Sequence, residues 1–214
     1  MRWISGVLCL AVLLSGGCAL AEETKARAAE NKAEVLEEKA ARNEPPSSGA
    51  AAPIAPGEAE AVDPAGEAPL DDAITCLARS IYWEAKGEPP EEMEAVANVV
   101  MNRVGDEDFP DTVCAVVKQG SETGSCQFSW WCDGRPDEVV EEKRYDLARE
   151  IARKALNGQL RDRTGGALYF HQRTVSPDWA RVYVRTAQTR RFLFYKPRLA
   201  KKPVADSAEN ARQP

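Results

Sequence analysis

Apolar positions recur at helical spacing in four stretches of this chain, and these stretches predict its helices. In the first stretch the recurring residues define one buried face, and the following Gly and two Pro residues stop the helix. The second stretch has acidic residues in its first turn and is followed by Gly105, which is typical of a complete helix. The predicted helical ranges are 72–86, 91–104, 112–118 and 136–156.

Shorter apolar and aromatic stretches predict strands. Residues 167–171 and 191–195 are expected to be two short strands near the end of the folded region. Residues 127–131 are rich in aromatic side chains and are expected to be extended, with a turn at Asp133 and Gly134. The predicted fold class is therefore α+β and mostly helical, with a small β-sheet in a single domain.

The first 21 residues have the pattern of a secretory signal peptide. Arg2 precedes an apolar run that ends in small residues and is too short to span a membrane. Cleavage after Ala21 is the favoured interpretation, and it leaves a soluble product without a transmembrane span. Processing before Cys18, with a lipid anchor on that cysteine, is the alternative. Either route leads to the bacterial envelope, as a periplasmic protein or as a membrane-anchored one.

Composition divides the rest of the chain into three parts. Residues 22–72 are rich in Ala, Glu and Pro, have almost no large apolar side chain, and are expected to form a disordered linker. Residues 73–196 are enough for one hydrophobic core. Residues 197–214 are expected to be a basic, disordered tail. The formal net charge of −6 comes from the linker. The sequence has no basic stripe interleaved with stacking aromatics, so nucleic acid is not an expected partner.

Four of the six cysteines follow the predicted signal peptide. An even number in an exported protein predicts disulfides, and four cysteines allow three pairings. We favour Cys114 with Cys126, which ties the third helix to the aromatic segment, and Cys76 with Cys132, which fixes the first helix. A zinc site is the alternative, but the spacing C-x₂₋₄-C is absent. No metal and no cofactor are expected.

Glu84 lies in the last turn of the first predicted helix, on the flank of its buried face. Desolvation and the negative end of the helix dipole both disfavour the ionised carboxylate, so the pKa of Glu84 is expected to be raised. A carboxylic acid that stays protonated near neutral pH is what glycosidic-bond cleavage needs as its general acid. The alternative interpretation is a solvated carboxylate at a helix end.

Several ordered segments of the chain resemble the cell wall hydrolase family of the spore-cortex-lytic type. They are YWEAKGEPPEEMEAVANVVMNRV, FPDTVCAVV, CQFSWWCDG and TGGALYFH, within roughly residues 73–195. The resemblance implies that residues 73–196 are a cell wall hydrolase catalytic domain with a lysozyme-like or lytic-transglycosylase-like fold. It also implies peptidoglycan as the partner and Glu84 as the catalytic acid, because Glu84 is the first Glu of the family's Y-x-E-A pattern.

Elimination narrows the chemistry further. His171 is the only histidine, so a zinc amidase or peptidase lacks ligands, and no G-x-S-x-G pattern indicates a serine hydrolase. Ordinary glycosidases use two carboxylates. A lytic transglycosylase needs only one, and this favours cleavage between N-acetylmuramic acid and N-acetylglucosamine through Glu84. Hydrolysis of the same bond and a non-catalytic, lectin-like role are the alternatives. Glu88 is expected to orient or cap, with a second catalytic carboxylate as its alternative role.

Other candidate residues concern substrate binding. Ser129 and Gln127 match the family's segment beside the cleft and are expected to hydrogen-bond substrate or position water. Tyr169 and His171 lie in the G-A-x-Y segment, where binding or stacking is expected rather than proton transfer. Trp83, Trp130 and Trp131 are candidate platforms for sugar rings, since flat aromatics stack on pyranose faces.

Core packing is the alternative role for two of these three tryptophans, and Asn102 and Arg103 are expected to brace the fold. One departure from the family pattern stands out. The family closes with I-G-x-H-x-F-Y, whereas residues 189–195 read TRRFLFY and lack both Gly and His. Either that His is not catalytic in general, or this protein differs in substrate choice or activity.

Overall fold

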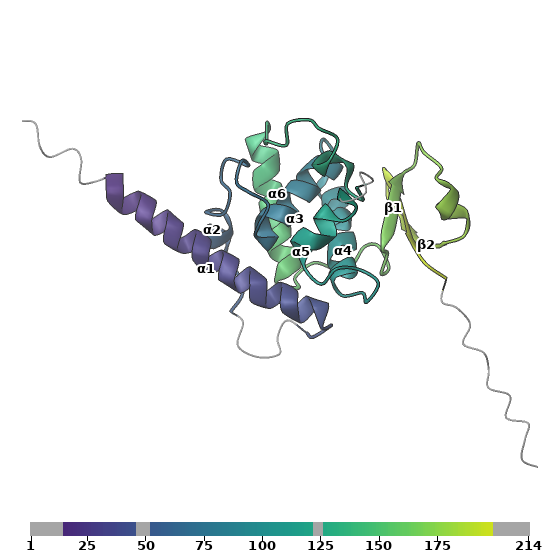
Figure 1. Cartoon of the computed structure of the whole chain (residues 1–214), viewed down its shortest axis with the longest axis horizontal. Helices are drawn as coiled ribbons and strands as arrows, with labels where there is room; N and C mark the ends of the chain where they lie inside the picture. The colour runs from purple at the N-terminus through teal and green to yellow at the C-terminus, as the bar shows by residue number, and fades with distance from the viewer. Residues whose placement is uncertain (1–14, 46–51, 122–125, 199–214) are drawn as a thin grey trace, which may run out of the picture.

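The computed structural model describes residues 15–45, 52–121 and 126–198. Its helices are α1 (Ser15–Ala41), α2 (Pro56–Ala59), α3 (Ala73–Glu84), α4 (Pro90–Val104), α5 (Val113–Lys118), η2 (Ser129–Trp131), α6 (Glu142–Leu156) and η3 (Asp178–Arg181). Its strands are β1 (Tyr169–Gln172), β2 (Val184–Gln188) and β3 (Phe192–Lys196). The mostly helical α+β class is confirmed, and Figure 1 shows helices α1 to α6 as one body with the small sheet at its side.

Helix α3 is the centre of the helical body, and its side chains are buried as far as Tyr82. It packs against both α4 and α6. Asp72 caps its first turn by accepting a hydrogen bond from the Thr75 amide at 2.9 Å. The helix ends at Glu84, and Gly87, with a φ of 80°, then turns the chain towards α4. The side chain of Glu84 is thereby left at the edge of the core.

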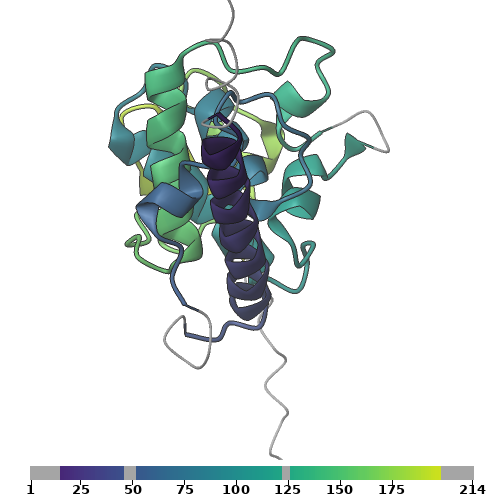
Figure 2. The same ribbon diagram turned by 90° about the vertical axis from the view of Figure 1, so that its left-hand side faces the viewer.

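Helix α1 lies across the helical body, on the side opposite the sheet (Figures 1 and 2). Ala29, Ala33 and Leu36 recur at helical spacing and are buried against the body. Polar contacts add to this packing, since the Glu37 carboxylate accepts a hydrogen bond from the Val113 amide, at the first turn of α5, at 2.9 Å. Helix α1 is therefore part of the folded domain.

The prediction of a disordered linker over residues 22–72 is wrong for the parts of that range that the structure describes. Alanine contributes little to hydropathy, yet it is the strongest helix former and its small side chain allows close packing. The face formed by Ala29 and Ala33 was for this reason invisible to a search for large apolar residues. Residues 46–51 of the predicted linker lie outside the described residues.

The predictions for the two ends of the chain lie largely outside the described residues as well. Residues 1–14 of the signal peptide and 199–214 of the tail are in this group, so both stay predictions. None of the described helices has the length and apolar character needed to cross a membrane.

Strand β3 is the centre of an antiparallel sheet with the order β1–β3–β2. Phe192 and Phe194 of β3 are buried, so one face of the sheet packs against the helical body. The strands predicted over 167–171 and 191–195 are confirmed with a shift of one or two residues. Strand β2 was missed because it is an edge strand with largely exposed side chains and no clear apolar alternation.

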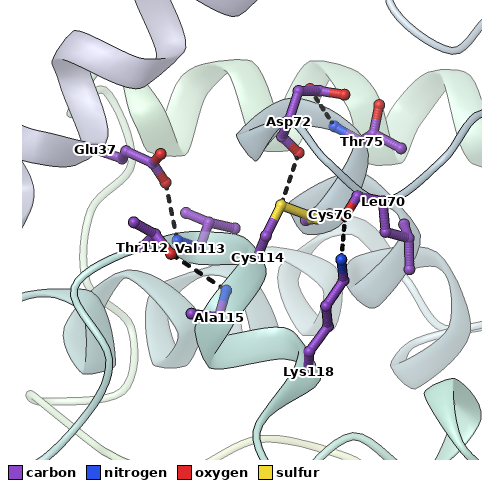
Figure 3. Close-up of a disulfide and its surroundings, with 10 residues drawn as sticks. All are labelled: Glu37, Leu70, Asp72, Thr75, Cys76, Thr112, Val113, Cys114, Ala115 and Lys118. Atoms are coloured by element: carbon purple, nitrogen blue, oxygen red, sulfur yellow. Dashed lines mark hydrogen bonds between the residues drawn. A yellow bond between two sulfur atoms is a disulfide. The ribbon is translucent and has the colours of Figure 1, made fainter.

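The four cysteines beyond residue 21 are paired, as expected, but both predicted pairings are wrong. Cys76 of α3 bonds to Cys114 of α5 rather than to Cys132, and Cys126 bonds to Cys132 rather than to Cys114. Figure 3 shows the first bridge beside the N-terminus of α5, where the Cα atoms of Cys76 and Cys114 are 5.2 Å apart. The pairing is determined by the face of α3 that α5 covers, and helical periodicity in the sequence does not predict which face that is.

The second disulfide also explains why residues 127–131 are not extended. Cys126 and Cys132 are six residues apart, yet their Cα atoms are separated by only 6.3 Å. A fully extended segment of that length would span about 20 Å. The chain therefore folds back on itself and includes the short helix η2.

Helix α6 begins at Glu142 rather than at the predicted Pro136. The preceding segment is held against α3 instead, because the Tyr82 hydroxyl accepts hydrogen bonds from the amides of Val140 and Glu141 at 3.2 and 3.1 Å. Arg79 of α3 donates to the Asp137 carbonyl from the same side. These contacts keep the segment out of the helix and place it beside the end of α3.

Candidate active site

Glu84 lies where two lobes of a cleft meet. The larger lobe has a volume of about 630 Å³ and the smaller one about 470 Å³. Glu84, Ser129 and Gln172 line both lobes, so the two form one elongated cleft with the Glu84 carboxyl group near its middle. An elongated cleft of this kind accommodates a chain-like ligand that extends on both sides of Glu84.

The position of Glu84 at the end of α3 determines its electrostatics. Its side chain is half-buried, and burial raises its pKa to about 7, while the positive charge of Arg103 acts in the opposite direction and is the smaller effect. The predicted direction of the shift is confirmed. Within the described ranges, no hydrogen bond or ion pair occupies the Glu84 carboxyl group. Glu84 is therefore an acid that can be protonated near neutral pH and can donate its proton into the cleft.

Arg103 of α4 forms part of the wall of the larger lobe. Its Nε donates to the Leu168 carbonyl at 2.7 Å, and its guanidinium lies 5.1 Å, 5.3 Å and 5.6 Å from the ring centroids of Phe109, Phe128 and Tyr169. Burial lowers the pKa of Arg103 to about 10. Arg103 braces the fold as expected, and it also places a positive charge near Glu84, which sequence reasoning missed.

Aromatic side chains form much of the wall of the larger lobe. Tyr169 and His171 of β1 are joined there by Trp179 and Tyr183. The Trp179 ring centroid is 5.7 Å from that of Tyr169 and 5.5 Å from that of His171. Flat, partly exposed rings of this kind suit the apolar faces of sugars. Trp179 was missed because it lies in a polar segment, Ser176 to Arg181, that has no strand or helix periodicity.

His171 is held in place by its neighbours. Its ring is stacked on Tyr195 at a centroid distance of 5.3 Å, and its Nε2 is 3.2 Å from the Tyr195 hydroxyl. Its Nδ1 is 2.8 Å from the Gln172 carbonyl. With both ring nitrogens engaged, His171 is better suited to shaping the wall of the cleft than to transferring protons.

The structure brings most of the other predicted residues to the cleft. Gln127 and Ser129 are exposed and line the larger lobe. Trp130 borders the smaller lobe but is itself buried, so it packs in the core more than it presents a flat surface. Trp83 borders the smaller lobe too, and its Nε1 donates to the Asp137 carbonyl at 3.2 Å.

Glu88 lies apart from Glu84. It is nearly buried, and its carboxylate pairs with Arg190 at 3.4 Å and with Arg191 at 3.2 Å. Glu88 lines neither lobe of the cleft. These contacts fit the expected orienting role better than a role as a second catalytic carboxylate. No group of three or more His, Cys, Asp or Glu residues in the described part of the chain is arranged to hold a metal ion.

A sequence model of the Cell Wall Hydrolase family matches residues 87–195. This is half of the chain, and the chain belongs to the Cell Wall Hydrolase family. The match begins three residues after Glu84, so it covers the cleft residues of α4 and the sheet but not the candidate acid itself.

Several relatives of this chain are spore cortex-lytic enzymes. The chain is 36% identical over 114 residues to the one from Halalkalibacterium halodurans, covering 51% of this chain and 30% of the relative. It is 34% identical over 124 residues to the one from Oceanobacillus iheyensis, covering 58% and 41%. The chain thus spans less than half the length of these relatives. The crystal structure of the catalytic domain of the Bacillus cereus SleB protein aligns with a TM-score of 0.48 at 29% identity, over 58% of this chain and 89% of that one.

Proposed function

We propose that this protein is an exported peptidoglycan glycosidase that cleaves the bond between N-acetylmuramic acid and N-acetylglucosamine, with a lytic-transglycosylase outcome. One observation carries the proposal: Glu84, with its pKa raised to about 7, lies at the junction of the two cleft lobes. Family membership supports the cell wall as the place of action. The spore cortex-lytic enzymes among its relatives support a lytic role.

The proposed reaction needs one protein carboxyl group. Glu84 donates its proton to the glycosidic oxygen as the bond from that oxygen to C1 of the muramyl sugar breaks. The N-acetyl group of the same sugar stabilises the positive charge that develops at C1. The 6-hydroxyl of the sugar then bonds to C1 and closes a 1,6-anhydro ring, and its proton returns to the Glu84 carboxylate. The enzyme ends the cycle protonated, without consuming water.

The environment of Glu84 supports this role at each step. A general acid transfers its proton most effectively when its pKa is close to the pH at which the enzyme works. Burial raises the pKa of Glu84 into the neutral range. Arg103 favours the carboxylate that remains after proton donation. Gln127 and Ser129 line the same lobe as Glu84, which suits them to bind the sugars that flank the broken bond.

Hydrolysis of the same bond is the second candidate, because the smaller lobe contains two more carboxylates. Asp133 and Asp137 line it beside Glu84. In a hydrolase, one of them would act as the second carboxylate that activates water or stabilises C1. Export to the periplasm, or anchoring through a lipid on Cys18, is part of the proposal and rests on the sequence of the first 21 residues.

Mass spectrometry of purified sacculi after incubation with the mature protein tests the proposed function. Anhydromuropeptides among the products support the lytic transglycosylase. Reducing muropeptides, with an oxygen from labelled water at C1, support the hydrolase instead. Intact glycan with the protein bound to it contradicts both and indicates a lectin-like protein.

A further inference from the structure

A third hollow, lined by Arg173, Arg190 and Arg191 and with a volume of about 170 Å³, adjoins the cleft. We call it the arginine pocket. Gln172 lines this pocket and both lobes of the cleft. The arginine pocket therefore adjoins the cleft at Gln172.

The three arginines are brought together by the ends of the sheet. Arg173 follows β1, and the other two precede β3. The Arg173 amide donates to the Arg191 carbonyl at 2.9 Å, which fixes the two backbones side by side. The buried Glu92 of α4 accepts hydrogen bonds from the Thr189 hydroxyl and from the Arg191 amide, the latter at 3.0 Å. The turn that presents Arg190 is thus anchored to the helical body.

The pocket has more positive charge than its own carboxylate neutralises. Glu88 is the carboxylate that lines it, and it pairs with Arg190 and Arg191, which leaves two positive charges in excess. The Arg191 Nε is buried and has no hydrogen-bond partner among the described residues. The Arg173 guanidinium likewise has no ion pair within the described part of the chain. The Arg173 and Arg190 side chains are exposed, so their guanidinium groups are the donors that a ligand in the pocket can reach.

We propose that the arginine pocket binds a carboxylate on the branch that distinguishes muramic acid from N-acetylglucosamine. This inference rests on the proposed function of the cleft. Muramic acid has a lactyl group that leads into a peptide stem, and the stem has free carboxylates. A muramic acid that has lost its stem has the lactyl carboxylate instead. Arginine is the side chain best suited to either group, because its planar fork donates two parallel hydrogen bonds to one carboxylate.

Binding at this pocket would determine which linkage is cut. The two sugars of the strand alternate, and a strand that slides by one sugar presents the wrong bond to Glu84. A carboxylate held at the arginine pocket fixes the muramyl residue at one position in the cleft. The pocket therefore acts as a specificity site for the register of the strand.

The test is a binding measurement with soluble glycan strands of three kinds: strands with intact stems, strands stripped by an amidase, and stem-bearing strands with their carboxylates blocked as neutral amides. The full mature chain is used with Glu84→Gln, so that cutting of the strands is slowed during the measurement. Arg173→Gln with Arg190→Gln removes two pocket charges. Arg161→Gln with Arg185→Gln is the matched control, because both side chains are exposed and make no hydrogen bond or ion pair in the described residues.

The pocket variant is expected to bind about tenfold more weakly than the control. A loss on stem-bearing strands alone identifies a stem carboxylate, and a loss on stripped strands alone identifies the lactyl carboxylate. The inference is overturned if the pocket variant and the control bind all three strands alike, or if the loss persists on blocked strands. The measurement needs no catalysis, so it tests the pocket separately from the proposed function. Carboxylate binding at the pocket can be disproved while the wild-type protein still cuts sacculi, and binding can be confirmed even if the protein cuts none.

Discussion

Arg103 lowers the pKa of Glu84 across the larger lobe of the cleft, while burial raises that pKa by a larger amount. The two residues belong to consecutive helices, Glu84 ending α3 and Arg103 lying in the last turn of α4. Burial without the arginine would raise the pKa of Glu84 further, and the arginine without burial would lower it below the ordinary value. The balance leaves a group with a pKa of about 7.

The raised pKa of Glu84 predicts that this residue destabilises the fold at alkaline pH. Its folded pKa of about 7 is above the ordinary value of 4.5, so its stabilising protonated state is complete below 4.5 and is lost as the pH rises through 7. Glu84→Gln removes this pH-dependent cost. In denaturant unfolding, the variant is expected to gain about 1–3 kcal/mol over wild type at pH 8 and to match it at pH 4.5. An equal difference at both pH values contradicts the assigned pKa.

Removing the charge of Arg103 should make Glu84 a weaker acid. In Arg103→Met the alkaline limb of the pH–activity profile is expected to move to higher pH, because the cation that favours the Glu84 carboxylate is gone. The variant also loses the hydrogen bond to the Leu168 carbonyl, at a cost of about 1–3 kcal/mol in stability. Arg103→Lys is the control, since it keeps the charge and should keep the limb near its wild-type position. A purely structural Arg103 would lower activity at all pH values and leave the limb unmoved in both variants.

Helix α1 should contribute to the stability of the domain. Leu36 is 4% exposed and packs against the body, whereas its neighbour Val35 is 41% exposed. Leu36→Ala is expected to lower the free energy of unfolding by about 2–4 kcal/mol, and Val35→Ala should change it by no more than about 0.5 kcal/mol. Denaturant midpoints measure both. If the two variants unfold at the same midpoint, α1 does not pack on the domain.

The two disulfides should differ in what they stabilise. Replacing Cys76 and Cys114 by Ser opens a loop of 38 residues and is expected to cost about 4 kcal/mol, whereas opening the six-residue loop of Cys126 and Cys132 should cost about 2 kcal/mol. The second pair flanks Gln127 and Ser129, so its loss should reduce activity more than its small effect on stability suggests. Peptide mapping without reduction checks the pairing first, and a Cys76–Cys132 peptide would contradict it.

The candidate acid was selected through the resemblance of its Y-x-E-A segment to the family, and local signals in the sequence support that choice. The helix stop at Gly87 and the apolar face of α3 together place Glu84 at a helix end beside the core, and the direction of its pKa shift follows from that. The same reasoning failed where the answer depends on which surfaces meet. The disulfide partner of Cys76 is determined by the packing of α5 on α3. Residues 22–41 are folded because their small side chains fit closely against the helical body.

The remaining cleft residues were hidden for a related reason. Gln172 and Trp179 have polar neighbours in the sequence and belong to no periodic apolar pattern. They line the cleft because β1 pairs with β3 and because the chain after β1 forms η3 beside it. Arg103 was assigned a bracing role, and its second role depends on the distance between α3 and α4. These properties belong to the tertiary structure, and a single sequence does not contain a local sign of them.

The most direct test of the central claim is the rate at which Glu84→Gln releases muropeptides from sacculi, compared with wild type and with Glu88→Gln. The glutamine keeps the size of the side chain but has no proton to donate. Release is expected to fall by about 10²–10⁴-fold in Glu84→Gln, with sacculus binding retained, and to fall much less in Glu88→Gln, whose carboxylate pairs with Arg190 and Arg191 outside the cleft. A Glu84→Gln protein that keeps more than about a tenth of wild-type activity would show that Glu84 is not the general acid.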